Sequence, residues 1–296
     1  MFRIVLLLFA GIGAGYLLRN WSFVARLERG VSLTVWALLF VFGVTIGSNR
    51  ELIVNFGRFG WQAAVIACLG VAGSFAAVFV VRRYFSGKEG AMRDSLIVFV
   101  FAVGVALGYA DAVPTWLLDP DLPMIILSVM VVLVGLGLGA GDNLHYMLRT
   151  FNWRMLLLPL CTIVGTLLFS ALGVLVLRGF SLTDCLAVGS GFGYYSLSSV
   201  LIADLKSATL GVQGAAELAT VALLANVVRE MIALFGMPLF ARWGGPLAPI
   251  SVAGVTSMDV CLPSIARYSG SDLVPLAILH GIVLEVCVPI LVGAFC

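Results

Sequence analysis

The chain has 296 residues, of which 61% are apolar and 11% are charged. A soluble domain has about 45–50% apolar and about 25% charged residues, so this composition excludes an ordinary water-soluble globule. The 17 basic and 15 acidic residues leave a formal charge of +2, which excludes a disordered polyelectrolyte and a nucleic-acid-binding protein.

The predicted fold class is therefore an all-α integral membrane protein. A helix needs about 20 mostly apolar residues to cross a bilayer, and such runs fill the first 180 residues. These spans are Ile4–Leu18, Val31–Ser48, Trp61–Val81, Leu96–Tyr109, Pro123–Ala140 and Met155–Leu177. Two more are predicted at Gly214–Phe240 and Leu273–Phe295, which makes about eight transmembrane helices.

An internal repeat relates the first three predicted spans to the next three. At a shift of 92 positions, the aligned pairs are Gly43 with Gly135, Gly47 with Gly139, Trp61 with Trp153 and Gly73 with Gly165. Because each copy holds an odd number of spans, the second copy must be inverted, as is common in secondary transporters. Residues 1–180 are thus predicted to form a scaffold of two inverted three-helix repeats.

A second repeat lies in residues 181–296, which we predict to be the transport region. At a shift of 63 positions, Ser190-Gly-Phe-Gly-Tyr-Tyr-Ser-Leu-Ser aligns with Ala253-Gly-Val-Thr-Ser-Met-Asp-Val-Cys. Both copies place small or polar residues inside an apolar stretch, and unwound backbone at that depth is tolerated only where protein covers it or it lines a watery cavity. We predict broken or re-entrant segments at Leu182–Ala203 and Leu247–Arg267, each followed by a full helix and inverted relative to the other.

The distribution of basic residues predicts the orientation, because cytoplasmic loops are enriched in Lys and Arg. More of these residues fall on one side of the predicted spans, which places both termini outside the cytoplasm. Met1-Phe-Arg resembles the start of a signal peptide, but the apolar run continues directly into further spans. We therefore interpret it as a retained first helix.

The six cysteines lie singly in apolar stretches without C-x-x-C spacing, and only two histidines could complete a metal site. We expect small buried apolar side chains at these positions, and neither a metal nor a cofactor.

Ionisable side chains at bilayer depth cost about 2.5–3.5 kcal/mol each on insertion scales, and so mark functional positions. The polar candidates at such depth are Asn226, Arg229, Glu230, Asp259, His280 and Glu285. Asp259 is the strongest, because it lies at a predicted helix break beside Thr256 and Ser257, where half-helix ends can hold a cation. The structural alternatives are an N-cap role for Asp259 and a buried ion pair between Arg229 and Glu230.

The position aligned with Asp259 in the first copy is Ser196, close to Tyr195 and Ser198. These hydroxyls either bind substrate or bond back to the helix. Glu285 and His280 are our candidates for proton coupling, with a packing role as the alternative for His280.

Asp142 follows the glycine-rich run 135–141, which fits close helix packing through small-xxx-small spacing. Gly139-Ala-Gly-Asp also fits the Gly-x-Gly-Asp pattern of an intramembrane aspartyl protease, in which two aspartates share a proton. The sequence has no Tyr-Asp dipeptide to supply the usual partner. A position at a helix end near the interface is the simpler interpretation of Asp142.

The buried charges favour a cationic ligand. Three carboxylates, those of Glu230, Asp259 and Glu285, accompany one guanidinium at depth. Such an excess suits a cationic solute, protons or Na⁺.

Several stretches resemble the bacterial lysine exporter family. They are Ser190-Gly-Phe-Gly-Tyr-Tyr-Ser-Leu-Ser, Asn226-Val-Val-Arg-Glu, Gly254-Val-Thr-Ser-Met-Asp and Asp272-Leu-Val-Pro-Leu-Ala-Ile-Leu-His-Gly. The resemblance implies a carrier in the bacterial inner membrane that exports L-lysine and toxic lysine analogues. It also implies a need for membrane-embedded acidic residues, which maps best onto Asp259, with Glu51 as the expected partner near the end of the second span.

The residues and the resemblance together favour a secondary active transporter rather than an enzyme. No nucleotide-binding G-x-x-x-x-G-K-[ST] motif occurs, which leaves proton or Na⁺ antiport as the energy source. We expect the lysine ammonium groups at Asp259 and Glu230, and the carboxylate at Arg229 or at backbone N–H groups of a half-helix start.

The expected movement is an elevator-like or rocking motion of residues 182–296 against the six-span scaffold. A stationary scaffold is compatible with a homodimer. The alternative function is a cation/proton antiporter or another solute carrier with crossed broken helices.

Overall fold

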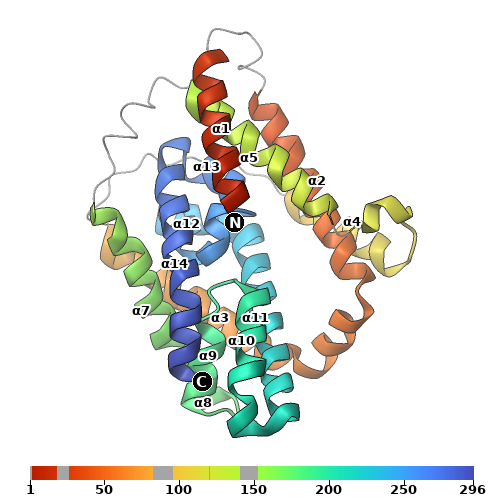
Figure 1. The fold of residues 1–296 in the computed structure, drawn as a ribbon, viewed down its shortest axis with the longest axis vertical. Helices are drawn as coiled ribbons and strands as arrows, with labels where there is room; N and C mark the ends of the chain where they lie inside the picture. Colours follow the sequence, from red (N-terminus) through yellow and green to blue (C-terminus); the bar gives the residue numbers. More distant parts are fainter. Residues whose placement is uncertain (1, 19–26, 83–95, 120, 141–152) are drawn as a thin grey trace. The chain divides into compact units, whose positions relative to one another are not determined.

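The computed structural model describes residues 2–18, 27–82, 96–119, 121–140 and 153–296. All secondary structure in these ranges is helical, as the predicted all-α class requires (Figure 1). The helical stretches in these ranges that are long and apolar enough to cross a membrane are Ile53–Val81, Arg154–Val176, Ser207–Gly244 and Ser271–Phe295. The chain is a multi-pass membrane protein, and the count of eight spans stays a prediction.

The chain folds into two compact units. The first comprises residues 1–53 and 93–152, and the second comprises residues 54–92 and 153–296. The two units do not divide at residue 180, since the second unit holds the third and sixth predicted spans together with both broken segments. The functional division into scaffold and transport regions stays a prediction.

The first unit consists of helices that pack in pairs. Its elements are α1 (Phe2–Leu18), α2 (Leu27–Ser48), α4 (Leu96–Tyr109), the short 3-10 helix η3 (Thr115–Leu118) and α5 (Leu122–Ala140). Helix α1 packs against α5, and α2 packs against α4.

Glycines allow the helix backbones of the first unit to touch. Gly11 in α1 lies against Gly135 in α5, and Gly43 in α2 lies against Gly104 in α4. A Cβ atom at Gly11, Gly43 or Gly104 would overlap backbone atoms of the partner helix. The glycine-rich run before Asp142 therefore packs helices closely, as its small-xxx-small spacing predicts.

The second unit contains the remaining helices. They are α3 (Arg50–Val81, whose first residues belong to the first unit), η4 (Trp153–Leu156), α7 (Leu157–Ala171), α8 (Gly173–Val176), α9 (Leu182–Gly189), α10 (Tyr195–Leu205), α11 (Ser207–Gly244), α12 (Ala248–Ala253), η5 (Gly254–Met258), α13 (Leu262–Tyr268), η6 (Ser271–Leu273) and α14 (Val274–Phe295). Helix α11 is kinked at Gly211, where φ is 72°.

Both predicted broken segments are interrupted in the structure. Between α9 and α10, Phe192 and Gly193 have positive φ angles of 46° and 95°, and Gly254 after α12 has a φ of 67°. Glycine adopts this conformation readily, whereas a residue with a Cβ loses about 1–2 kcal/mol. The strained Phe192 is held by the second segment, because its carbonyl accepts a 2.9 Å hydrogen bond from the Val255 N–H.

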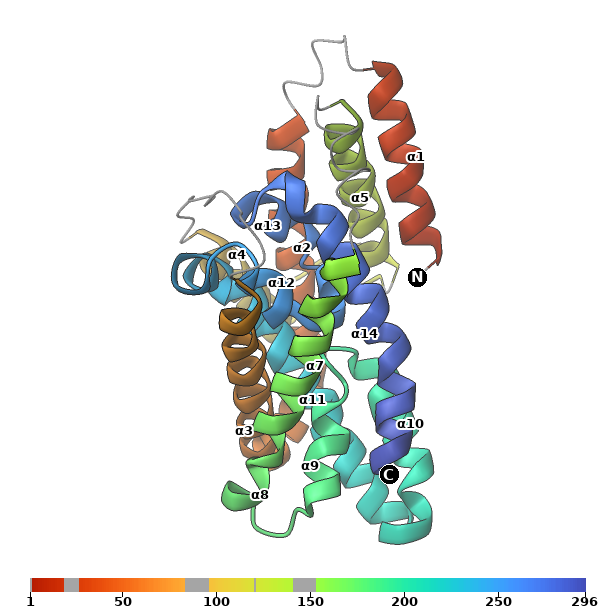
Figure 2. The same cartoon turned by 90° about the vertical axis from the view of Figure 1, so that its left-hand side faces the viewer.

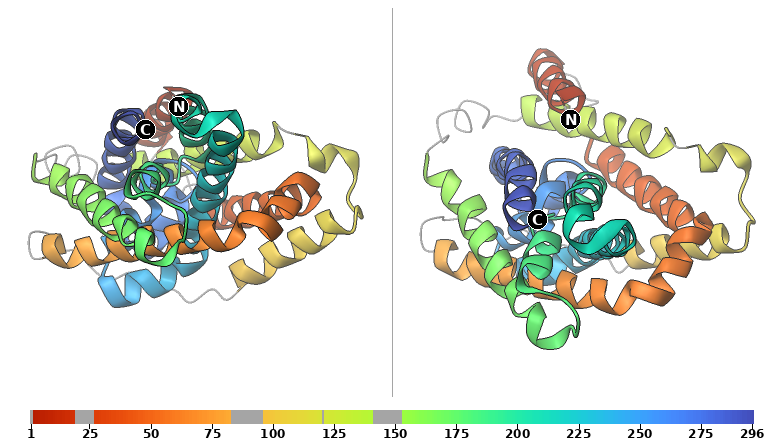
Figure 3. Two further views of the ribbon diagram at one scale, coloured as in Figure 1. Left: turned by 90° about the horizontal axis from the view of Figure 1, so that it is seen from below. Right: turned by 60° about the horizontal axis from the view of Figure 1, so that its bottom comes forward.

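The two ends of the first broken segment lie next to each other. Asp184, in the first turn of α9, and Lys206, directly after α10, form a buried ion pair with Nζ and Oδ1 2.8 Å apart. Figures 1 and 2 show α9 and α10 side by side with these ends at the lower end of the second unit, and Figure 3 views them from below. A segment that crossed the membrane would separate its ends by about 30 Å, so the ion pair supports a re-entrant form.

Equivalent positions of both predicted repeats are in contact within the second unit. Ser74 in α3 and Thr166 in α7 are 92 positions apart, and their hydroxyl oxygens are 2.8 Å from each other. Phe192 and Val255, which share the backbone hydrogen bond described above, are 63 positions apart. Copies related by a two-fold axis touch at equivalent positions only near that axis. These contacts support the repeats, whose inverted arrangement stays a prediction.

The expected burial of the cysteines is correct for Cys185 and Cys261 and wrong for Cys68, which is exposed on α3. All six thiols are free. A membrane helix turns one face to lipid, where a small apolar side chain costs nothing. A cysteine with apolar neighbours in the sequence can therefore face lipid and need not be buried inside the protein.

Candidate functional site

Asp259 lies at the second helix break, between η5 and α13. Its backbone angles, φ −129° and ψ −101°, continue neither helix. Its Oδ1 accepts a 2.6 Å hydrogen bond from the N–H of Val260. The N-cap residue of α13 is Cys261, without a side-chain cap. Asp259 is therefore not the N-cap of α13, and its second carboxylate oxygen keeps its capacity to bind a ligand.

Two further carboxylates act on Asp259, and we call the three residues together the acidic cluster. Glu230, on α11, is 4% exposed and interacts electrostatically with Asp259. Glu285, on α14, is partly exposed and also interacts with Asp259. The structure thus brings together three acids that lie up to 55 positions apart in the sequence.

Glu230 is a buried acid that the protein leaves unpaired. Among the described residues, none forms an ion pair with it or donates a hydrogen bond to it. The ion pair with Arg229 that we considered from the sequence is therefore not formed. Burial of a charged group is costly unless the charge is paired or hydrogen-bonded, so Glu230 calls for a bound cation or a proton.

The start of α10 adjoins the acidic cluster. Tyr195, which is 39% exposed, interacts electrostatically with Glu230 and Asp259. Ser196 is exposed in the same turn. The N-cap residue Tyr194 makes no side-chain cap, so the first N–H groups of α10 keep the free donors of a helix start.

Asn226 holds the first helix break in place. Its Oδ1 accepts a 2.7 Å hydrogen bond from the Gly193 N–H, and its Nδ2 donates to Ser198 Oγ at 3.2 Å and to the Ala222 carbonyl at 2.8 Å. Ser198 in turn donates to the Tyr194 carbonyl at 2.8 Å. The predicted binding residues Asn226 and Ser198 are thus engaged with the protein itself.

Arg229 contacts both broken segments. Its Nη2 donates to Ser74 Oγ at 2.6 Å, and its Nε donates to the Val252 carbonyl at 3.4 Å in the last turn of α12. Its guanidinium carbon is 5.7 Å from the ring centroid of Phe192 in the first break. A cation suits this place, because carbonyls at a helix C-terminus carry partial negative charge.

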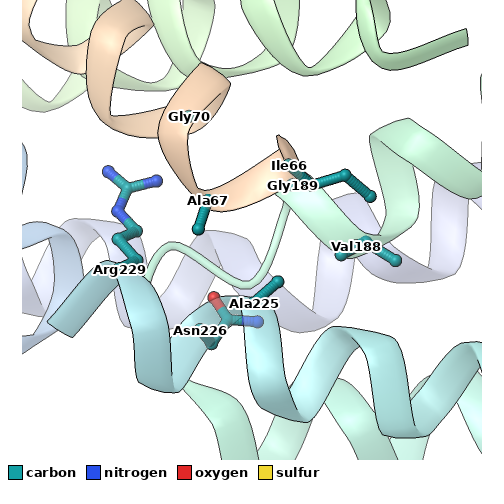
Figure 4. Close-up of a pocket in the computed structure, with 8 residues that line it drawn as sticks. All are labelled: Ile66, Ala67, Gly70, Val188, Gly189, Ala225, Asn226 and Arg229. Atoms are coloured by element: carbon teal, nitrogen blue, oxygen red, sulfur yellow. The ribbon is translucent and has the colours of Figure 1, made fainter. Parts of the chain in front are cut away.

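A small cavity lies beside Arg229 on the α3 side of α11 (Figure 4). Its lining residues are Ile66, Ala67, Gly70, Val188, Gly189, Ala225, Asn226 and Arg229. The lining includes none of the three acids, so the guanidinium and the acidic cluster belong to different surroundings.

Two predicted hydroxyls of the second break are also hydrogen-bonded internally. Thr256 donates to the Ala253 carbonyl at 2.9 Å. Ser257 donates to the Ala277 carbonyl at 2.9 Å and lies 3.1 Å from Nδ1 of His280. Both hydroxyls therefore shape the break that carries Asp259.

Sequence analysis missed a group of buried hydroxyls in the apolar helices, namely Ser74, Thr162, Thr166 and Ser251. A signal was present for one pair, because Ser74 and Thr166 are aligned by the 92-residue repeat directly after the glycine match. The contact of Ser74 with Arg229 spans 155 positions, which no local pattern predicts.

The structure does not describe the side chains of two lower-ranked candidates. Glu51 belongs to the first turn of α3, and its side chain is outside the described residues. Asp142 also lies outside them.

The chain is similar to known proteins of one family. Residues 5–92 and 98–296 match the family described as "Lysine exporter LysO". The chain is 25% identical over 317 residues to "Lysine exporter LysO" of Escherichia coli strain K12, an alignment that covers 100% of this chain and 99% of that protein. It is 30% identical over 195 residues to a Haemophilus influenzae protein whose name also describes a lysine exporter, with 65% of this chain and 93% of that protein covered.

No solved structure matches the chain. The family match includes both broken segments and every residue of the acidic cluster. It leaves out only the few residues before position 5 and between positions 92 and 98. By this match, the chain belongs to the LysO family of lysine exporters.

Proposed function

We propose that the protein exports L-lysine and lysine analogues across the bacterial inner membrane as a secondary active transporter. The observation that carries the proposal is Glu230, a buried carboxylate without a partner among the described residues, beside Asp259 at a helix break. The names of the two relatives, both lysine exporters, supply the substrate.

The acidic cluster is the proposed site for the substrate's ammonium groups. Asp259 and Glu230 repel each other when both are ionised, and Glu285 adds to that repulsion. The two ammonium groups of a bound lysine would relieve this repulsion at two points. Charge-assisted hydrogen bonds from an ammonium to a carboxylate are about twice as strong as neutral ones.

The start of α10 is the proposed site for the substrate's carboxylate. Sequence analysis left Arg229 and backbone N–H groups as alternatives. Arg229 is engaged with Ser74 and Val252 on the α3 side of α11, whereas the uncapped start of α10 adjoins the acidic cluster. Backbone N–H groups and the helix dipole favour an anion there.

Antiport with protons or Na⁺ is the proposed energy source. Glu285 is the first candidate for a coupling proton, because it interacts with Asp259 and is partly exposed. Protonation of Glu285 after lysine leaves would lower the repulsion on Asp259. Lysine and the coupling proton would then neutralise the same group of carboxylates in turn.

The proposed moving body is the second compact unit, residues 54–92 and 153–296, rather than residues 182–296 alone. It holds both broken segments and the helices α3 and α7, which contact the second of them. The first unit is then the stationary part, which a homodimer could anchor.

The test is uptake of radiolabelled lysine into proteoliposomes that are preloaded with lysine, with and without an imposed pH or Na⁺ gradient. Asp259→Asn should lower lysine flux on the order of 100-fold, since it removes one partner of a buried charge interaction. The matched control is Asp272→Asn, an exposed acid on η6 of the same unit, which should transport normally.

Intact lysine flux in Asp259→Asn would contradict the site. Absence of lysine flux in the wild type, together with Na⁺-dependent proton movement, would favour the cation/proton antiporter. Competition by ornithine and arginine in the same assay ranks the cationic amino acids.

A further inference from the structure

His280 is a fully buried histidine with a hydroxyl on each ring nitrogen. It lies on α14 and is 0% exposed. Its Nδ1 is 3.1 Å from Ser257 Oγ, and its Nε2 is 3.1 Å from Thr162 Oγ1. Both polar atoms of the ring are thereby satisfied, as buried polar groups normally are.

The two hydroxyls belong to different parts of the second unit. Ser257 is in η5, two residues before Asp259, while Thr162 is in α7. Thr162 Oγ1 is 2.7 Å from Ser251 Oγ, and Ser251 donates to the backbone carbonyl of Ser74 in α3 at 2.8 Å. His280 therefore links the break that carries Asp259 to two continuous helices.

The histidine ring is part of the hydrogen-bond network of this region. Ser257 uses its proton on the Ala277 carbonyl, so its oxygen accepts from Nδ1–H of His280. Thr162 Oγ1 lies within hydrogen-bond distance of the Leu158 carbonyl, Ser251 Oγ and Nε2. His280 thus joins η5 to α7 through both of its nitrogens.

We infer that His280 is a positioning residue: it holds η5 through Ser257, so that Asp259 is presented to the acidic cluster. This inference rests on the proposed function, since it concerns the same site. It removes His280 from the candidates for the coupling proton and leaves the carboxylates to carry it.

The test separates positioning from proton transfer with two substitutions of His280. In His280→Gln, the side-chain amide offers one donor and one acceptor in place of the ring nitrogens and does not titrate. In His280→Leu, the volume is kept while both hydrogen bonds are lost. Each variant is reconstituted, and lysine counterflow without a gradient is compared with lysine flux driven by a pH gradient.

For His280→Gln we expect the ratio of gradient-driven flux to counterflow to remain within about twofold of the wild type. For His280→Leu we expect both fluxes to fall together by about tenfold, because buried hydroxyls lose their partner. Retained counterflow with loss of gradient-driven flux in His280→Gln would overturn the inference and make His280 a proton carrier.

Ser257→Ala tests the same link without changing the histidine. The KM for lysine should rise by about three- to tenfold with little change in maximal flux, as expected when a binding carboxylate is misplaced. The control is Thr220→Ala, whose hydroxyl donates within its own helix to the Ala216 carbonyl at 2.8 Å. Wild-type lysine affinity in Ser257→Ala would overturn the positioning role.

A wild type without any lysine flux would instead refute the proposed function, before either histidine variant is compared. The two failures are therefore distinct.

Discussion

Glycines bring helix backbones into direct contact in both compact units, but the two units differ in where they keep charged side chains. In the first unit, the described ion pair between Arg50 and Asp111 is on the surface, with side chains 55% and 72% exposed. In the second unit, the pair between Lys206 and Asp184 is buried, with side chains 6% and 9% exposed. Among the residues that the structure describes, buried charged side chains occur only in the second unit.

This difference shows where chemistry is possible. A packed helix pair with all backbone groups satisfied internally offers nothing to a ligand. An interrupted helix exposes backbone donors and acceptors, which in turn stabilise side-chain charge nearby. The acidic cluster lies where interrupted helices supply such backbone groups, at the second break and the start of α10. Matched substitutions in the two units test this comparison.

The largest effect is expected from Lys206→Met, which leaves the buried carboxylate of Asp184 without its counter-ion. Breaking such a pair from one side costs about 3–5 kcal/mol, which should appear as a large fall in the thermal midpoint of the purified protein in detergent. The double variant Lys206→Met/Asp184→Asn should recover most of the loss, because no charge is orphaned. A double variant as unstable as the single one would contradict this.

An intermediate effect is expected from Gly254→Ala at the second break. The new Cβ would overlap the carbonyl oxygen of Phe192, and the φ of 67° disfavours any side chain. Residues held in such conformations cost about 1–3 kcal/mol each, and lysine counterflow should fall because Asp259 is displaced.

The control for Gly254→Ala is Gly137→Ala in α5, where a Cβ meets no atom within 4 Å. It should be neutral or stabilise the protein by up to about 1 kcal/mol, as alanine does in a helix interior. Equal effects of the two alanines on counterflow would show that the break has no special role.

The smallest effect is expected from Arg50→Gln in the first unit. Exposed ion pairs contribute less than about 1 kcal/mol, so the thermal midpoint should change little and lysine flux should persist. The same measurements as for Lys206→Met apply. A fall in the thermal midpoint as large as that of Lys206→Met would mean that burial does not determine how much these ion pairs stabilise the protein.

The sequence alone predicts the helical class, both breaks and the position of Asp259 at the second break. The reason is physical: glycine and hydroxyl residues interrupt an otherwise apolar run, and few structures tolerate that at bilayer depth. The repeat alignment also drew attention to Tyr195, which interacts electrostatically with Glu230 and Asp259.

The partners of the polar side chains are not predictable in this way. Asn226 could bind a substrate or a backbone group, and only the fold brings the Gly193 N–H to its carboxamide oxygen. The sequence left a buried ion pair of the neighbours Arg229 and Glu230 as an alternative, whereas the fold turns the guanidinium toward Ser74. Long-range packing decides between alternatives that local spacing leaves equal.

The hydrogen bond between Phe192 and Val255 also sets an order of events during synthesis. The carbonyl that accepts it is made 63 residues before the amide that donates it. Until Val255 has been synthesised, the first break contains a carbonyl without its native partner. A chain truncated before Val255 lacks that partner altogether, so the first segment reaches its native hydrogen bonding only once the second is present.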